Sequence, residues 1–91
     1  MFDWDDANEG HIWERHRVTR DEAEEAATDE RRFSYPGASA GERRVVVVGS
    51  THAGRILAVV YTIRSGRFRV ATARDANRWE RERYRRQGRR K

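Results

Sequence analysis

Apolar and polar residues alternate along the second half of the chain, the spacing expected of β-strands with one buried face. Three valine-rich segments show this pattern, at about residues 43–50, 55–64 and 67–74. Two short runs of turn-forming residues, 51–54 and 65–66, separate them. Connections this short join neighbouring antiparallel strands, so the pattern predicts a meander.

The two-residue turn Ser65-Gly66 also predicts the register of the last two strands, with Arg64 opposite Arg67. If the pairing continues without a shift, one face of the hairpin is apolar and forms the core. That face carries Leu57, Val59, Tyr61, Ile63, Phe68 and Val70. The opposite face carries Ala58, Val60, Thr62, Arg64, Arg67, Arg69, Ala71 and Ala73. Small residues and arginines therefore share a surface that could accept an RNA strand or a partner.

Two helices are expected before these strands. An aspartate, Asp5 or its neighbour, can cap a first helix over residues 7–16. Thr19 and Glu22 have the spacing of a capping box, in which each side chain bonds the backbone of the other residue. The box predicts a second helix at residues 20–28.

Shorter elements complete the pattern. Strands are expected at residues 2–4 and 33–35, and Asp75 can cap a C-terminal helix over residues 76–86. A basic tail follows at about residues 86–91. The predicted fold class is α+β, with two N-terminal helices packed on an antiparallel sheet and a C-terminal helix.

The length of the chain, residues 1–91, indicates a single domain, because two hydrophobic cores would each be too small to be stable. Hydrophobic residues make up 36% of the sequence and charged residues 38%. An average soluble domain has roughly 45–50% apolar and about 25% charged residues, so a thin core and a heavily charged surface are expected.

Charge is divided unevenly along the chain. Residues 1–30 carry eleven acids and three arginines (net −8), whereas residues 31–91 carry seventeen basic residues and four acids (net +13). Nineteen of the twenty basic residues are arginine, whose planar fork binds phosphate oxygens in pairs. A phosphate-rich partner is the inference, and the alternative is an arginine-rich surface that serves solubility alone.

Several classes of protein and site are not expected. Cysteine is absent, which excludes disulfides and thiolate metal sites. The longest apolar run, residues 56–61, is far short of the roughly 20 residues of a membrane-spanning helix. Acids stand near the start of the chain where a signal peptide has basic residues, so a cytoplasmic protein is expected. His11 and His16 are five apart and predicted on different helix faces, so we expect no metal and no cofactor.

Two blocks of residues carry a resemblance to a known family. The first contains Phe2-Asp3-Trp4-Asp5, Asn8, His16, Val18-Thr19 and Glu22-Ala23. The second contains Gly49-Ser50-Thr51, Gly54-Arg55, Val59-Val60-Tyr61-Thr62, Arg64, Ala71-Thr72-Ala73-Arg74-Asp75-Ala76, Glu80-Arg81 and Tyr84. Taken together, and in this order along the chain, the two blocks resemble the BrnT family of bacterial toxins. One departure is Arg17, which stands where the family usually has a glycine that eases the turn between the helices.

The resemblance implies a RelE-like fold and a ribonuclease toxin of a type II toxin-antitoxin system, which cleaves RNA and so inhibits translation. It implies a BrnA-like antitoxin that dimerises through a ribbon-helix-helix domain, giving a heterotetramer. Operator DNA would be contacted only through the antitoxin. The residues themselves independently support the sheet, the helices and the preference for phosphate.

Metal-independent RNA cleavage needs a base, an acid and cations that stabilise the phosphate. The resemblance to RelE-like folds implies that arginines and a tyrosine or an acid fill these roles. The candidate catalytic residues are Arg64 and Arg74 as phosphate stabilisers, Glu80 as base and Tyr84 as acid or positioning group. The candidate RNA-binding residues are Arg55, Arg67 and Arg69.

Each candidate has a simpler interpretation. The arginines could be surface or antitoxin contacts, and Glu80 could form an ordinary pair on the helix surface. Two other functions also stay open. The chain could be a catalytically inactive, toxin-like partner that acts only in antitoxin binding and operon co-repression, or a nucleic-acid-binding protein that does not cleave.

Overall fold

The computed structural model describes residues 1–37 and 43–89. These residues form three helices and one five-stranded sheet, which confirms the α+β fold class. The elements are β1 (Phe2–Asp3), α1 (Asp6–His16), α2 (Arg20–Ala27), β2 (Phe33–Pro36), β3 (Arg44–Ser50), β4 (Ile56–Arg64), β5 (Arg67–Asp75) and α3 (Arg78–Arg89). None of the helices in this part of the chain has the length and apolar content needed to cross a membrane.

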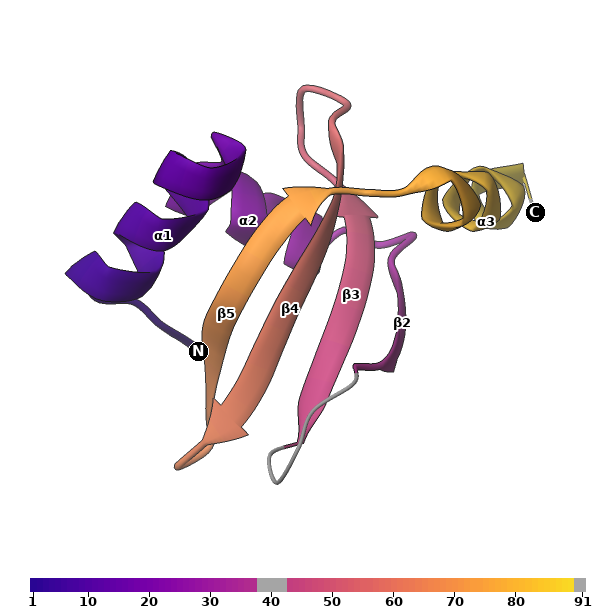
Figure 1. The fold of residues 1–91 in the computed structure, drawn as a ribbon. Coiled ribbons are helices and arrows are strands. Elements are labelled where there is room, and N and C mark those ends of the chain that lie inside the picture. The colour runs from indigo at the N-terminus through magenta and orange to yellow at the C-terminus, as the bar shows by residue number, and fades with distance from the viewer. Residues whose placement is uncertain (38–42, 90–91) are drawn as a thin grey trace.

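The sheet has the order β1-β5-β4-β3-β2 (Figure 1). Strands β3 to β5 form the predicted antiparallel meander, β2 extends it along the other edge of β3, and β1 adds a short parallel pair to the edge of β5. Arg64 lies opposite Arg67 as predicted. Ser65 and Gly66 both have positive φ, 51° and 75°, as a type I′ hairpin requires.

A β-bulge interrupts this hairpin and corrects the predicted faces. Val60 lies opposite Thr72, but Tyr61 lies opposite Val70, so Ala71 is an extra residue in β5. Beyond the bulge every side chain of β5 points to the face opposite to the one predicted. Ala73 was expected on the arginine-bearing face and is instead fully buried in the core.

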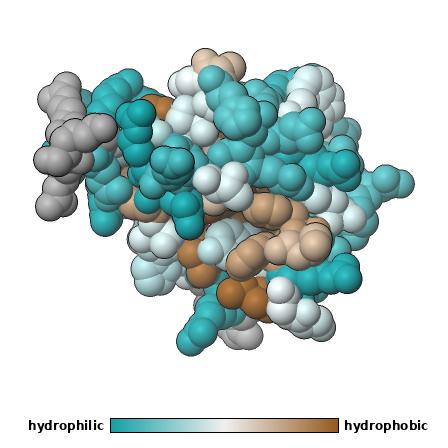
Figure 2. Space-filling model, turned by 180° about the vertical axis from the view of Figure 1, so that it is seen from behind, coloured by the Kyte–Doolittle hydropathy of each residue, from teal (hydrophilic) through white to brown (hydrophobic). Residues whose placement is uncertain are grey.

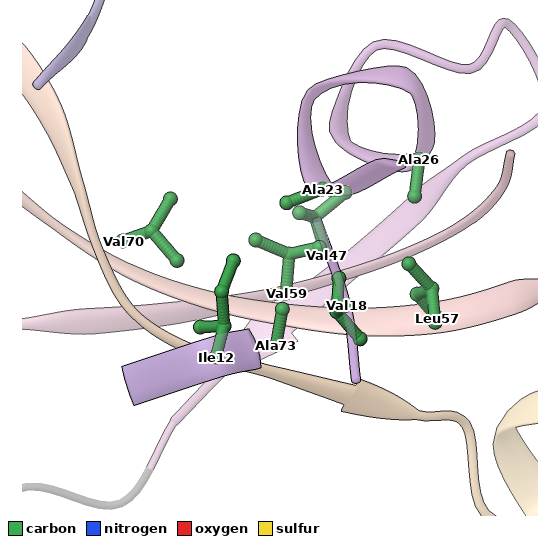
Figure 3. Close-up of a cluster of buried hydrophobic side chains, with 9 residues drawn as sticks. All are labelled: Ile12, Val18, Ala23, Ala26, Val47, Leu57, Val59, Val70 and Ala73. Carbon is green, nitrogen blue, oxygen red and sulfur yellow. The ribbon is translucent and has the colours of Figure 1, made fainter. Parts of the chain in front are cut away.

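Helices α1 and α2 pack on one face of the sheet, here called the back face (Figure 1). Their small and branched side chains meet those of the sheet in the main core (Figure 3), which contains Ile12, Val18, Ala23, Ala26, Val47, Leu57, Val59, Val70 and Ala73. The helices do not cover the whole face. Ile63, predicted to be core, is 54% exposed, and apolar groups are visible on this side of the molecule (Figure 2).

The opposite face of the sheet, here called the front face, carries alternate residues of β3, β4 and β5. These residues are Arg44, Val46, Val48, Ala58, Val60, Thr62, Arg64, Arg67, Arg69, Thr72 and Arg74. At one end of the front face, a second core that includes Phe33 and Tyr84 packs the sheet against β2 and α3. No described helix crosses in front of β4 and β5 in Figure 1.

The helix starts follow the sequence signals at the N-terminal end of the chain. Asp5 caps α1, and the capping box of Thr19 and Glu22 is present at α2. Arg17, where the family usually has glycine, still adopts the left-handed conformation, with φ 54°. Its guanidinium lies 5.2 Å from the centre of the Trp13 ring, a cation–π contact that helps to offset the strain.

The start of the C-terminal helix was predicted two residues too early. Asn77, not Asp75, caps α3: its side chain accepts a hydrogen bond from the Glu80 N–H at 3.0 Å. Asp75 is instead paired with Arg55 at 2.9 Å. The helix continues to Arg89, into the segment expected to be tail, and residues 90–91 lie outside the described part of the chain.

Candidate functional site

The shift at the bulge turns Arg74 onto the front face, where it meets Glu80 at the start of α3. Arg74 donates from Nη1 to Glu80 Oε1 at 2.8 Å and from Nη2 to Oε2 at 3.2 Å. The side chain of Glu80 is 0% exposed, whereas that of Arg74 is 32% exposed. The structure therefore brings together two of the four residues predicted to be catalytic, with the arginine facing solvent.

Every lone pair of the Glu80 carboxylate is occupied. Besides Arg74, the Tyr35 hydroxyl donates to Oε2, and the Asn77 N–H donates to Oε1 at 2.8 Å. Burial alone would raise the pKa of Glu80, but these hydrogen bonds outweigh burial and hold the pKa below its usual value. Glu80 is thus an ionised acceptor that orients Arg74, with no open position from which to take a proton.

Arg74 keeps part of its donor capacity. A guanidinium has five N–H donors. Three of the Arg74 donors are used, two on Glu80 and one on the Asp75 carbonyl at 3.3 Å. The hydrogen bonds to Glu80 raise the pKa of Arg74, so the group stays charged. Because the side chain is also partly exposed, it can contact an anion without breaking the pair.

Tyr84 lies one turn beyond Glu80 on α3, but the two side chains do not share a site. The Tyr84 hydroxyl donates to Asp29 Oδ2, which also accepts the Ser50 N–H at 2.8 Å. Burial and the neighbouring Asp29 carboxylate raise the pKa of Tyr84 to about 12. This pair attaches α3 to the segment after α2, away from Arg74.

Arg64 and Arg74 lie at opposite ends of the front face. Arg64 is opposite Arg67 at the hairpin, whereas Arg74 is opposite Ala58. Six residues of β4 separate these positions, which is roughly 20 Å at about 3.3 Å per residue. At this separation the two arginines do not face the same phosphate.

Arg55 was predicted to bind RNA, and the structure places it in a network inside the protein. Its Nε bonds Asp75 at 2.9 Å, and its two terminal nitrogens donate to the Arg17 and His16 carbonyls at 2.8 and 3.0 Å. The hydrogen bond to Asp75 is the largest cause of its raised pKa. Arg55 therefore ties the turn between α1 and α2 to the end of β5.

Of the two other arginines predicted to bind RNA, Arg67 is exposed and Arg69 is largely neutralised. Arg69 pairs with Asp5 at 2.9 Å and with Asp3 at 3.6 Å. The Asn8 N–H and then the Arg69 guanidinium lower the pKa of Asp5. Arg69 thus attaches β5 to the start of the chain as well as facing the sheet surface.

A cavity of about 250 Å³ lies between α1 and the hairpin end of the front face, and we call it the cationic cavity. It is lined by Ala7, Asn8, His11, Arg44, Thr62, Arg64, Arg69, Val70 and Ala71. Of its arginine and histidine residues, Arg64 and Arg69 were predicted as site residues, whereas Arg44 and His11 were not. Arg44 lies two residues before Val46 in the same predicted strand, so the alternation of side chains could have placed Arg44 on this face.

His11 and His16 lie closer together than their spacing suggested. Their ring centres are 6.4 Å apart in an edge-on arrangement, although the residues were predicted on different faces of the helix. His16 is the last residue of α1, so its ring can lean back along the helix. Burial, then the positive charge of Arg15, lowers the pKa of His16 and favours its neutral form.

Two buried side-chain atoms in the described residues have no hydrogen-bond partner, and both belong to the front face. They are Arg44 Nε and Thr72 Oγ1. Arg44 is paired through the sheet with Thr62, and Thr72 with the next front-face residue of β4, so they occupy adjacent rows. Unpaired buried polar atoms are rare in folded proteins, and Arg44 also lines the cationic cavity.

The comparison with known protein families agrees with the resemblance in the sequence. Residues 4–80 match the family described as the ribonuclease toxin BrnT of type II toxin-antitoxin systems. No curated protein matches the chain. Because the match covers most of the sequence, including most of both resembling blocks, the chain belongs to the BrnT family of ribonuclease toxins of type II toxin-antitoxin systems.

Proposed function

We propose that this chain is a metal-independent endoribonuclease that cuts RNA lying along the front face and so inhibits translation in the cytoplasm. The observation that carries the proposal is the partly exposed Arg74, which is fixed by the buried carboxylate of Glu80. An arginine fixed in this way binds a phosphate without first losing side-chain freedom.

The length of the front face supports a strand rather than a single nucleotide. Arg74 is at one end, and Arg64 and the cationic cavity are at the other. A separation of roughly 20 Å spans several nucleotides, since successive stacked nucleotides of a strand advance by about 3.4 Å. We assign Arg74 and Arg64 to different phosphates, with Arg67 as a further backbone contact.

Glu80 and Tyr84 act by positioning in this proposal. Glu80 orients Arg74, and Tyr84 attaches α3 to Asp29, because the polar atoms of both side chains are already engaged. Neither takes part in proton transfer.

The proposed partner is a BrnA-like antitoxin with a ribbon-helix-helix domain, in a heterotetramer that contacts operator DNA only through the antitoxin. Support comes from the family, whose description names a type II toxin-antitoxin system. The antitoxin would cover the basic front face or add a strand to an edge of the sheet. A complex in which Arg64, Arg67 and Arg69 all remain open to solvent would contradict this part of the proposal.

Replacing Arg74 tests the nuclease function directly. We expect wild-type protein to cut RNA, and Arg74→Ala to lower kcat/KM by about 10- to 100-fold through the loss of a charged hydrogen-bonding group. Arg74→Lys keeps a cation beside Glu80 but loses the paired geometry, and we expect a loss of about 10-fold. Gel analysis of RNA fragments measures the rates, and circular dichroism checks that each variant is folded.

Arg78→Ala is the matched control, because Arg78 stands on the same helix and its side chain is 88% exposed. Its kcat/KM should stay near that of the wild type. A wild-type protein that binds RNA and never cuts it would favour the non-cleaving nucleic-acid-binding alternative. A protein that binds only the antitoxin would favour the inactive, co-repressing partner.

A further inference from the structure

The cationic cavity contains a donor that the protein itself leaves unused. Arg44 Nε is buried and has no hydrogen-bond partner among the described residues. Arg69, in the same cavity, has its own counter-ions in Asp3 and Asp5. Folds seldom retain a buried unpaired donor unless a ligand or a reaction uses it. Arg44 lines the cavity, and its terminal nitrogens, not the shielded Nε, are the atoms that would meet an external anion there.

The size and lining of the cavity fit a phosphate group with part of its ribose. Its volume of about 250 Å³ corresponds to roughly eight water molecules at about 30 Å³ each. Arginines from β3, β4 and β5 converge on it, and Thr62 adds a hydroxyl. Guanidinium groups bind phosphate oxygens through paired hydrogen bonds, so the cavity suits a phosphodiester.

Hydrogen bonds of Asn8 hold the part of α1 that carries His11 beside the cavity. The Asn8 side-chain amide donates to the Asp3 carbonyl at 3.0 Å and to the Val70 carbonyl at 3.2 Å. These bonds hold the first turns of α1 against β5. Residues three apart on a helix lie on the same side, so His11 is presented to the cavity that Asn8 also lines.

The other candidate proton carriers are occupied. Glu80 accepts four hydrogen bonds, and the hydroxyl groups of Tyr35 and Tyr84 each donate to a carboxylate. His11, by contrast, is exposed and lines a cavity that can hold a phosphate. Imidazole is the side chain best suited to exchange protons near neutral pH.

We propose that the cationic cavity binds the phosphate at which RNA is cut, that Arg44 is its principal donor, and that His11 takes the proton from the attacking 2′-hydroxyl. This inference rests on the nuclease function proposed above and names the residues that perform its chemical step. Arg64 shares the cavity and contributes positive charge, while Arg74 holds a phosphate farther along the strand.

The reaction requires no metal, cofactor or redox partner. The 2′-oxygen loses its proton to His11 and forms a bond to phosphorus, while the bond from phosphorus to the 5′-oxygen breaks. The leaving 5′-oxygen takes a proton from water at the cavity mouth, and the hydroxide left behind recovers the proton held by His11. The products are a 2′,3′-cyclic phosphate and a 5′-hydroxyl. Arg44 stabilises the charge that develops on the phosphate oxygens.

The test separates binding from cleavage. Fluorescence anisotropy with a 2′-O-methyl RNA oligonucleotide, which cannot be cut, measures affinity, and unmodified RNA measures the rate. We expect Arg44→Gln to weaken binding about 10-fold, while His11→Ala leaves affinity within about threefold and lowers kcat by about 10²- to 10⁴-fold. Wild-type products should carry 2′,3′-cyclic phosphate ends.

The control is His52→Ala, because the His52 side chain is 84% exposed and pairs with Glu25 outside the cavity. It should match the wild type in both measurements. Undiminished cleavage by His11→Ala overturns the role of His11, and undiminished RNA affinity in Arg44→Gln overturns the phosphate site. If the wild type cuts no RNA, the nuclease function and the role of His11 fail together, and the affinity of Arg44→Gln alone then decides whether the cavity binds phosphate.

Discussion

Gly49→Ala should destabilise the protein by about 3 kcal/mol or more, at the upper end of what an added methyl group costs in a packed core. A Cβ atom at this position would lie 2.0 Å from the carbonyl oxygen of Ala26 and 2.9 Å from its carbonyl carbon. Both are backbone atoms of α2, so no side-chain rotation can relieve the clash. The helix would have to move away from β3, which would open the main core.

Gly10→Ala provides the matched comparison. Gly10 lies within α1, and an added Cβ would meet only Glu14 Oε1, at 3.9 Å. Alanine in a helix is more stable than glycine by roughly 0.5–1 kcal/mol, so this variant should melt at or above the wild-type temperature. Thermal unfolding followed by circular dichroism measures both variants. Equal melting temperatures for Gly49→Ala and the wild type would contradict the close packing of α2 on β3.

Glu80→Ala should cost about 3–5 kcal/mol of unfolding free energy, the range observed when one partner of a buried ion pair is removed. Arg74 loses its counter-ion, and the Tyr35 hydroxyl and the Asn77 N–H lose their acceptor. We expect α3 to detach first. Chemical denaturation measures the free energy, and Glu82→Ala is the control, since Glu82 forms an exposed pair with Arg78 and should contribute little.

The same carboxylate should make stability depend on pH in a defined direction. The folded pKa of Glu80 lies below its ordinary value of 4.5, so its contribution is fully present above about pH 4.5 and is lost as the pH falls through the folded pKa. In the Glu80→Gln variant this side chain has no group that titrates in this pH range. The difference in melting temperature between the wild type and Glu80→Gln should therefore be largest near pH 7 and shrink below pH 4.5. A difference that stays constant down to pH 3 would contradict an ionised Glu80.

Local signals in the sequence predicted much of the fold. The turn Ser65-Gly66 predicted the hairpin and its first pairs because two-residue loops allow few conformations. The box of Thr19 and Glu22 predicted the start of α2, since both partners lie within one turn. Features that depend on distant residues were missed, and the parallel pairing of β1 with β5 is one example.

The α3 start was missed for a related reason. Asp75 and Asn77 are both good caps, and only the pairing of Asp75 with the distant Arg55 decides between them. The candidate site residues show the same division. Arg74 and Glu80 were proposed from the sequence, but their contact depends on the bulge at Ala71, which changes the face on which Arg74 lies. Nothing in the local sequence marks Arg44 as an unpaired donor.

The bulge also means that the pairing of one residue, Ala71, determines which side of the sheet is charged. If Ala71 were paired in an unbroken ladder, the regular alternation would run through it, and Ala73 and Arg74 would exchange faces. The guanidinium would then point into the apolar layer beneath α1 and α2, and Glu80 would be left buried beside a methyl group. Loss of the Ala71 codon alone, by contrast, should leave both faces as they are, because Val70 and Thr72 already lie on opposite faces, as consecutive residues of a regular strand do.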